Sequence, residues 1–160
     1  MSDSYFLWTH GVNVIPEYTK EYTGTDNGLY MRRAGFYAII RQNGGTENWF
    51  HFPIPTPTWL DDNKVEHYHA FLRGYVYPTA AIDLVHVRES RDGYEAHKIY
   101  DSDEKDPIYL NDGQFEVDFN LEDRSCTGPL VMCVHVKFID EANQVMFTGA
   151  GGSFEEQSWS

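Results

Sequence analysis

Residues 130–138 have the sequence LVMCVHVKF, and its polarity alternates with a period of two. The even-numbered positions from Leu130 to Phe138 are all apolar, whereas the odd-numbered positions include Cys133, His135 and Lys137. Successive side chains of a β-strand point to opposite faces, so this pattern predicts a strand with one buried face. The stretch therefore favours a β-sheet protein.

Two other stretches alternate in the same way. In residues 114–120, Phe115, Val117 and Phe119 share one face, and polar side chains share the other. In residues 6–14 the even positions hold the larger apolar and aromatic side chains, and we expect that face to point inward. Its members are Phe6, Trp8, His10, Val12 and Val14.

Further strands are expected wherever β-branched and aromatic residues lie between turn residues. The expected ranges are 34–42, 48–53, 65–77, 81–89, 94–100 and 144–150. Asn43-Gly44-Gly45 is typical of a hairpin turn, and the glycines at 149, 151 and 152 suggest a bend or bulge. No segment has a helical period of useful length, so any helix should be a short turn.

Many short strands at this spacing predict an all-β, single-domain antiparallel β-sandwich of jelly-roll-like type, with a small β-barrel as the alternative. The domain should span residues 1–160, which is long enough for a hydrophobic core. Residues 155–160 are expected to form a frayed tail. The aromatic content of 16% agrees with a strand-rich fold.

The formal net charge of −13 excludes two classes of partner. A phosphate backbone or an anionic membrane surface would repel the chain, so we expect neither nucleic acid nor membrane as a partner. Cys126 and Cys133 form no disulfide framework, and their spacing matches no zinc site. With no signal-peptide pattern at the start and no apolar span, the expected location is cytoplasmic.

The most distinctive segment is NWFHFPIPTPTW, residues 48–59. Its alternating prolines lack the backbone donor that a central strand needs, so the chain should leave the sheet near Pro53. The segment would then be an edge strand that ends in a rigid crossover. Alternatively, it could form a pocket wall on which Trp49 and Trp59 supply flat surfaces.

Two histidines are candidates for chemistry. An inward His10 beside Trp8 would be neutral and suited to proton transfer or to hydrogen bonding a ligand, although a core histidine more often satisfies a backbone carbonyl. His51 shares a face with Trp49. If that face and His10 line one cavity, two imidazoles and two indoles would make a single site.

The metal and cofactor signals are weaker. Strand spacing should place His67 and His69 on one face, which is similar to part of the cupin metal site, but no downstream carboxylate completes the pattern. Residues 101–106 are rich in carboxylates but lack the glycine and terminal glutamate of a calcium loop, which favours a solvated acidic turn. No phosphate loop or dinucleotide fingerprint occurs, so no cofactor is expected.

Four segments occur in an order that resembles a family of small, uncharacterised bacterial proteins. These are Trp8-Thr9-His10-Gly11, residues 48–57, residues 85–87 and residues 149–154. The family has a Trp-x-His-Gly start and a Trp-Phe-His-x-Pro-Ile-Pro-Thr-Pro centre. The resemblance implies a compact β-sandwich, directs attention to the tryptophans and histidines of both motifs, and implies no activity. The chain departs from the pattern in residues 66–77 and 101–106.

Three functions remain open. The first is a domain that binds a small molecule or a carbohydrate through an aromatic face, with candidate ligand-binding residues Trp8, His10, Trp49, His51 and Trp59. The second is a cofactor-independent cyclase or isomerase for a hydrophobic metabolite, in which His10 and His51 are catalytic. The third is a homo-oligomeric subunit that assembles through the aromatic stretch 68–77.

Overall fold

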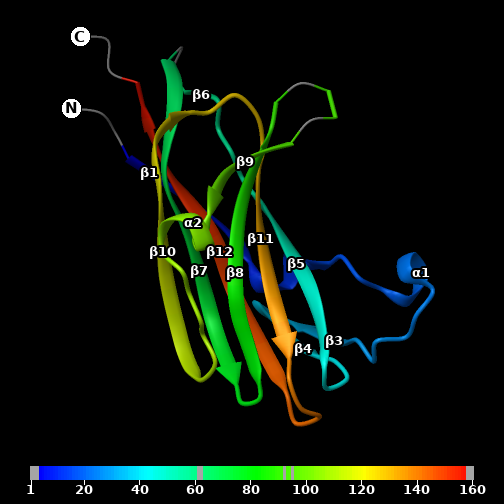
Figure 1. The fold of residues 1–160 in the computed structure, drawn as a ribbon. Coiled ribbons are helices and arrows are strands. Elements are labelled where there is room, and N and C mark those ends of the chain that lie inside the picture. The colour runs from blue at the N-terminus through cyan, green and yellow to red at the C-terminus, as the bar shows by residue number, and fades with distance from the viewer. Residues whose placement is uncertain (1–3, 61–62, 92, 95, 158–160) are drawn as a thin grey trace.

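The computed structural model describes residues 4–60, 63–91, 93–94 and 96–157. Within these residues the chain forms two antiparallel sheets packed as two layers, as Figure 1 shows. The expected β-sandwich is confirmed, and the barrel alternative is wrong because the two sheets remain separate.

Sheet A has the strand order β10-β7-β12-β4-β3, with β1 paired to β12 and β6 paired to β7. Its strands are β1 (Ser4–His10), β3 (Tyr30–Ala34), β4 (Tyr37–Arg41), β6 (Trp59–Leu60), β7 (Asn63–Tyr77), β10 (Gly113–Ser125) and β12 (Gln144–Glu156). Sheet B has the order β2-β5-β11-β8-β9. Its strands are β2 (Ile15–Pro16), β5 (Thr46–Ile54), β8 (Ala80–Ser90), β9 (Ala96–Asp101) and β11 (Leu130–Phe138).

Only short helices interrupt the strands in the described ranges, as the sequence predicts. They are the 3-10 turn η1 (Gly11–Asn13) and the single-turn helices α1 (Lys20–Thr23) and α2 (Ser102–Lys105). Helix α1 belongs to a loop that projects beside the sandwich (Figure 1). No helix in the described part of the chain is both long and apolar enough to cross a membrane.

The core lies between the two sheets and confirms the faces predicted for residues 130–138 and 114–120. All five even-numbered side chains of β11 are buried, and on β10 Phe115 and Phe119 are buried while Val117 packs against the core. The ring of Phe52 from β5 meets Phe147 from β12 edge-on, with 5.1 Å between centroids. Aromatic contacts of this kind join the sheets.

Strand β1 has the opposite orientation to the one expected. Phe6 is 61% exposed, Trp8 is 38% exposed and His10 is exposed, whereas Tyr5 and Leu7 pack against the core. The expectation that Phe6, Trp8 and His10 point inward is therefore wrong. Both faces of this strand carry apolar side chains, so its alternation alone does not identify the buried face.

Three expected boundaries also change. The expected strand 34–42 begins later, because Ala34 ends β3, Gly35 lies at φ 61° in the hairpin turn, and β4 covers only Tyr37–Arg41. Asn43-Gly44-Gly45 is not a hairpin turn, because it connects β4 of sheet A to β5 of sheet B. Strand β12 continues through its glycines to Glu156, and Glu155 pairs with Ser4 instead of beginning a tail. Residues 158–160 of the expected tail lie outside the described residues.

The proline-rich segment crosses from one sheet to the other. Strand β5 ends at Ile54 in sheet B, and Trp59 begins β6 in sheet A. The expected crossover between the sheets is confirmed, but β5 is not an edge strand, because it pairs with both β2 and β11. The same crossing separates Trp49 and Trp59, so the two indoles do not form one pocket wall.

Candidate functional site

The outer face of sheet A carries four neighbouring rings, which we call the aromatic strip: Phe6 and Trp8 from β1, and His69 and Phe71 from β7. Phe71 is central, with ring centroids 5.2 Å from Trp8, 6.0 Å from Phe6 and 6.4 Å from His69. The interplanar angles are 23°, 29° and 10°, so the rings share a common orientation. Exposed rings grouped in this way are typical of a binding surface.

Glycines of β12 make room for the strip. β12 lies between β1 and β7, and Gly151 pairs with Trp8 on one side and with Phe71 on the other. A Cβ atom built on Gly151 would lie 3.0 Å from the Trp8 ring and 2.5 Å from the Leu7 carbonyl oxygen. Gly151 therefore allows the indole to lie close against the sheet. The expected bulge occurs at the start of the glycine run, where the pairing of β12 with β7 shifts between Phe147 and Gly149.

Polar side chains from β10 border the strip. Asp118 pairs in register with Phe71, and its Oδ1 lies 2.7 Å from Nδ1 of His69. Glu116 accepts hydrogen bonds from the Arg73 guanidinium, with its Oε1 2.8 Å from Nη2 and 3.0 Å from Nε. The same guanidinium lies 4.2 Å from the centre of the Trp8 ring. Donors and acceptors are thus held at fixed positions beside apolar rings.

Two hollows lie along this face. One, of about 420 Å³, is lined by Trp8, Thr9, His10, Phe36, Arg73, Thr148 and Gly149. The other, of about 260 Å³, is lined by Arg73, Gly74, Tyr75, Gln114, Phe115, Glu116, Met146 and Thr148. Because Arg73 and Thr148 line both, the two hollows adjoin. The face can therefore hold a ligand larger than a single small ring.

His51 lies on the other side of the sandwich. It lines a separate hollow of about 240 Å³ on sheet B with Trp49, and its Nε2 lies 3.0 Å from Oε1 of Glu17. His10 lines a hollow on sheet A. The two histidines therefore do not share a cavity, and a joint catalytic site of His10 and His51 is wrong.

The sheet B hollow offers less free aromatic surface. The indole of Trp49 packs against the imidazoles of His86 and His135, with ring centroids 5.0 Å and 4.9 Å away. His135 is itself held by Asp83, with 2.6 Å between Nδ1 and Oδ1. Cys133 also lines this part of the sheet, where burial raises its pKa to about 11. That thiol is a poor nucleophile at neutral pH.

His67 and His69 point to opposite faces of β7. The pairing of β7 with β12 shifts between Ser153 and Phe154, which leaves Tyr68 as an extra residue. This bulge reverses the alternation, so His67 is fully buried while the His69 side chain is 40% exposed. The expectation of one shared face is wrong, and the two imidazoles cannot ligate one metal ion.

In the acidic segment 101–106, which the sequence compares with a calcium loop, Asp101 has a structural role. Asp101 caps helix α2 by accepting a hydrogen bond from the backbone N–H of Asp103, and it pairs with Lys98. Within the described ranges, no group of three or more histidine, cysteine or acidic residues is arranged to hold a metal ion.

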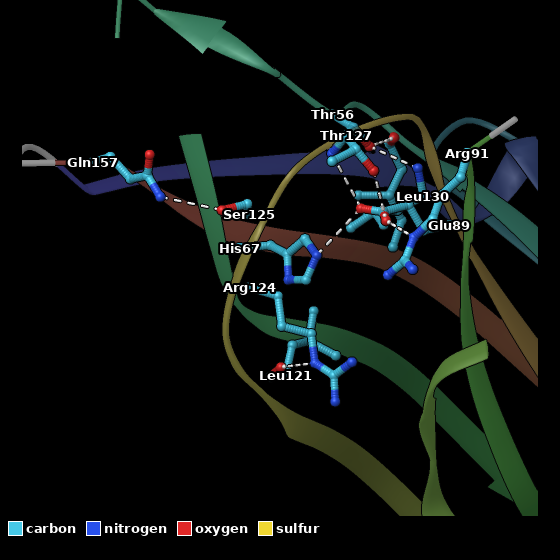
Figure 2. A network of polar contacts seen from close by, with 11 residues as sticks. Thr56, His67, Glu89, Arg91, Leu121, Arg124, Ser125, Thr127, Leu130 and Gln157 are labelled. Carbon is cyan, nitrogen blue, oxygen red and sulfur yellow. Dashed lines mark hydrogen bonds and ion pairs between the residues drawn. The ribbon is translucent and has the colours of Figure 1, made fainter. Parts of the chain in front are cut away.

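A second polar cluster is buried at the end of the sandwich, between the sheets, and Figure 2 shows its contacts. The carboxylate of Glu89 (β8) accepts hydrogen bonds from Nε of Arg91 at 2.7 Å and from the hydroxyl of Thr127 at 2.9 Å. It also lies 3.5 Å from Nε2 of His67. Burial disfavours the charge on Glu89, but the hydrogen bonds from Arg91 and Thr127 prevail and lower its pKa.

The imidazole of His67 lacks hydrogen-bond partners in this cluster. Neither ring nitrogen makes a hydrogen bond, since the Glu89 contact is too long to count as one. Burial lowers the pKa of His67 against the opposing attraction of Glu89, so the folded protein holds this ring neutral. His67 and Glu89 are closed to solvent, whereas the Arg91 side chain is partly exposed, and we assign the cluster to stability.

We expect His67→Leu to leave the free energy of unfolding at pH 7 unchanged or to raise it by about 1 kcal/mol, because a buried unsatisfied polar group is removed. A lowered pKa means that the unfolded chain binds the extra proton, so wild-type stability falls as pH drops below 6.5. Urea unfolding between pH 7 and pH 5 should show a shallower slope for the variant. An unchanged slope would contradict the burial of a neutral His67.

Several residues of the sheet A face were not singled out by the sequence. Phe71, Arg73, Glu116 and Asp118 belong to it, whereas the sequence points to residues 66–77 as a departure from the family pattern and to residues 68–77 as an assembly surface. The available signal was the odd-numbered row of β7, where His69, Phe71 and Arg73 alternate with buried residues. Placing that row beside β1, across β12, requires the strand order, which the sequence does not reveal.

The model of a family described as "Family of unknown function (DUF6623)" matches residues 2–146. No curated protein matches the chain significantly.

Some solved β-sandwich structures are similar in outline. The structure described as "CBM4 structure and function" has a TM-score of 0.46 and 12% identity, covering 92% of this chain and 89% of its own. "Carbohydrate binding module family29" has a TM-score of 0.44 and 6% identity, covering 98% and 89%. "CBM29_1, A Family 29 Carbohydrate Binding Module from Piromyces equi" has a TM-score of 0.38 and 10% identity, and the match covers 88% of this chain and 90% of that one. Values this low assign no ligand to this chain.

Proposed function

The chain belongs to this family of unknown function, and we propose that it binds carbohydrate on the outer face of sheet A. The observation that carries the proposal is the aromatic strip beside a line of fixed polar groups. Phe71 contacts three further rings, and Arg73 and Asp118 lie next to them. The domain therefore acts as a binding module.

The chemistry of a sugar ring fits this arrangement. A pyranose has faces made largely of C–H bonds, which pack on an aromatic ring, and a rim of hydroxyl groups, which need hydrogen-bond partners. Phe6 and Trp8 are 61% and 38% exposed and supply apolar surface. The carboxylates of Glu116 and Asp118 accept hydrogen bonds from hydroxyls, and the Arg73 guanidinium donates them.

The surroundings hold these groups in place before a ligand arrives. Trp8 lies against Gly151, and Arg73 is fixed by Glu116 on the neighbouring strand. Side chains that are ordered in the free protein lose less conformational entropy on binding. Sheet A thus presents a rigid platform, which favours binding without covalent chemistry.

We expect Trp8→Ala and Phe71→Ala each to weaken binding of a soluble polysaccharide about thirtyfold, because truncating a central aromatic contact costs about 2 kcal/mol. Affinity electrophoresis on gels containing neutral glucans, mannans and xylans identifies the ligand, and calorimetry measures the loss. Trp59→Ala is the matched control, since Trp59 is 59% exposed but lies outside the strip. That variant should bind as the wild type does.

Two results would contradict the proposal. One is a Trp8→Ala variant that remains folded by circular dichroism and binds with wild-type affinity. The other is a wild-type protein that binds no polysaccharide but dissociates from oligomer to monomer on the same substitution in light scattering. The strip would then be an assembly surface.

A further inference from the structure

The outer row of β7 continues beyond the aromatic strip. Tyr75 and Tyr77 follow His69, Phe71 and Arg73 on the same face of β7. The ring centroids of the two tyrosines lie 4.5 Å apart. Eight residue steps of about 3.3 Å make the row from the first histidine to the last tyrosine about 26 Å long. Aromatic surface is therefore present at both ends, with a guanidinium between them.

Hollows accompany the part of this row from Arg73 to Tyr77. The hollow beside Trp8 and the hollow beside Tyr75 adjoin at Arg73. A third hollow, of about 290 Å³, is lined by Tyr77 together with Arg41, Pro78, Glu141, Ala142, Asn143 and Gln144. Since the rings of Tyr75 and Tyr77 touch, the third hollow follows the second. The hollows thus lie in series, which suits a long ligand better than a compact one.

A polar and acidic strand borders the β7 row, and its Gln114 and Glu116 line the middle hollow. Strand β10 pairs with β7 so that Asn120, Asp118, Glu116 and Gln114 lie opposite His69, Phe71, Arg73 and Tyr75 in turn. These exposed amides and carboxylates repeat along the strand, so a ligand with hydroxyls at regular intervals can bond to each. The charge of Arg73 is matched by Glu116, and the whole chain has a net charge of −13. An anionic polymer would be repelled.

We infer that the ligand is a linear, uncharged polysaccharide whose chain lies along β7, from the aromatic strip to the pair Tyr75 and Tyr77. This inference rests on the proposed function and extends it to the ligand's length and charge. Consecutive sugar rings occupy the hollows in series, and the tyrosine pair forms a second stacking position. Long oligosaccharides then gain contacts that short ones cannot reach.

The experiment is calorimetric titration with neutral oligosaccharides of increasing length, from disaccharide to hexasaccharide, taken from the polysaccharide that the wild type binds. Affinity should rise with length. The double variant Tyr75→Ala/Tyr77→Ala should bind the hexasaccharide about tenfold more weakly and the disaccharide as the wild type does. Oligogalacturonides of equal length should bind at least tenfold more weakly than the neutral series. Tyr22→Ala on the projecting loop, where Tyr22 is 83% exposed, is the matched control.

The outcomes distinguish failure of the extended site from failure of carbohydrate binding. Equal affinity for all lengths, or wild-type hexasaccharide binding by the tyrosine variant, would overturn the extended site while Trp8→Ala still tests the proposed function. Oligogalacturonides that bind as well as neutral chains would overturn the uncharged class. If the double variant unfolds, Tyr77→Ala alone, at a 38% exposed position, takes its place. Failure of every neutral oligosaccharide to bind would instead refute carbohydrate binding itself.

Discussion

Glu89→Ala should lower the free energy of unfolding by about 3–5 kcal/mol, because it leaves buried hydrogen-bond donors unsatisfied and opens a cavity. The carboxylate is fully buried, and its loss leaves the Thr127 hydroxyl and backbone N–H without their acceptor. It also removes the partner of Arg91 and leaves a cavity beside His67 (Figure 2). A loss of this size is a large part of a domain's stability.

The effect should be structural because of where Glu89 lies. It bonds to Thr127 in the connection that carries the chain from β10 of sheet A to β11 of sheet B. The same connection approaches the end of β8 so closely that a Cβ atom on Gly128 would lie 1.8 Å from the Ser90 carbonyl oxygen. Glu89 therefore holds the two sheets together at this end of the sandwich.

Urea unfolding at pH 7 measures the loss, and Glu89→Gln serves as the comparison. The amide keeps the volume and one acceptor oxygen, so it should cost about 1–2 kcal/mol. Because the pKa of Glu89 is lowered in the folded state, its contribution is present above the unfolded value of 4.5 and disappears as pH falls below it. Equal stability of wild type and Glu89→Ala at pH 7 would show that the cluster contributes nothing.

The parts of the fold that the sequence predicts correctly are those where the two faces of a strand differ in polarity. On β11 the apolar face is continuous from Leu130 to Phe138, and on β10 the opposite face is entirely polar, so the buried side is decided locally. Strand β1 offers no such contrast. Its buried side depends on the neighbouring β12, where the glycines leave space above the sheet for Trp8.

The candidate site was predicted only in part for the same reason. Trp8 and His10 were identified as ligand-binding candidates and do line a hollow, but their partners on β7 and β10 come from strands far away in sequence. The bulge at Tyr68 is equally invisible to a period of two, and it separates His67 from His69. Long-range pairing and bulges are tertiary properties, which alternation within one strand does not encode.

Gly151→Ala should weaken polysaccharide binding by more than the loss of one ring does, although the substitution adds a single methyl group. The new Cβ would lie 2.5 Å from the Leu7 carbonyl oxygen and 3.0 Å from the Trp8 ring, so β1 and the indole must both move. Displacing Trp8 separates it from Phe71 and Arg73 together. Overpacking of this kind costs about 1–3 kcal/mol of stability as well.

Gly149→Ala is the control that isolates this effect. Gly149 lies on the same face of β12 two residues away, but a Cβ atom there would be 3.4 Å from the Thr9 carbonyl oxygen and 3.8 Å from the Trp8 ring, which are ordinary or nearly ordinary contacts. Gly149 also lines the hollow beside Trp8, so the test is the difference between the two variants: thermal unfolding should leave the Gly149 variant close to wild type, and calorimetry should show a smaller loss of binding than for Gly151→Ala. If Gly151→Ala binds as tightly as Gly149→Ala, the position of the indole over β12 is not what the ligand requires. Binding would then depend on the rest of the β7 row, where Tyr75 and Tyr77 lie far from the substituted glycine.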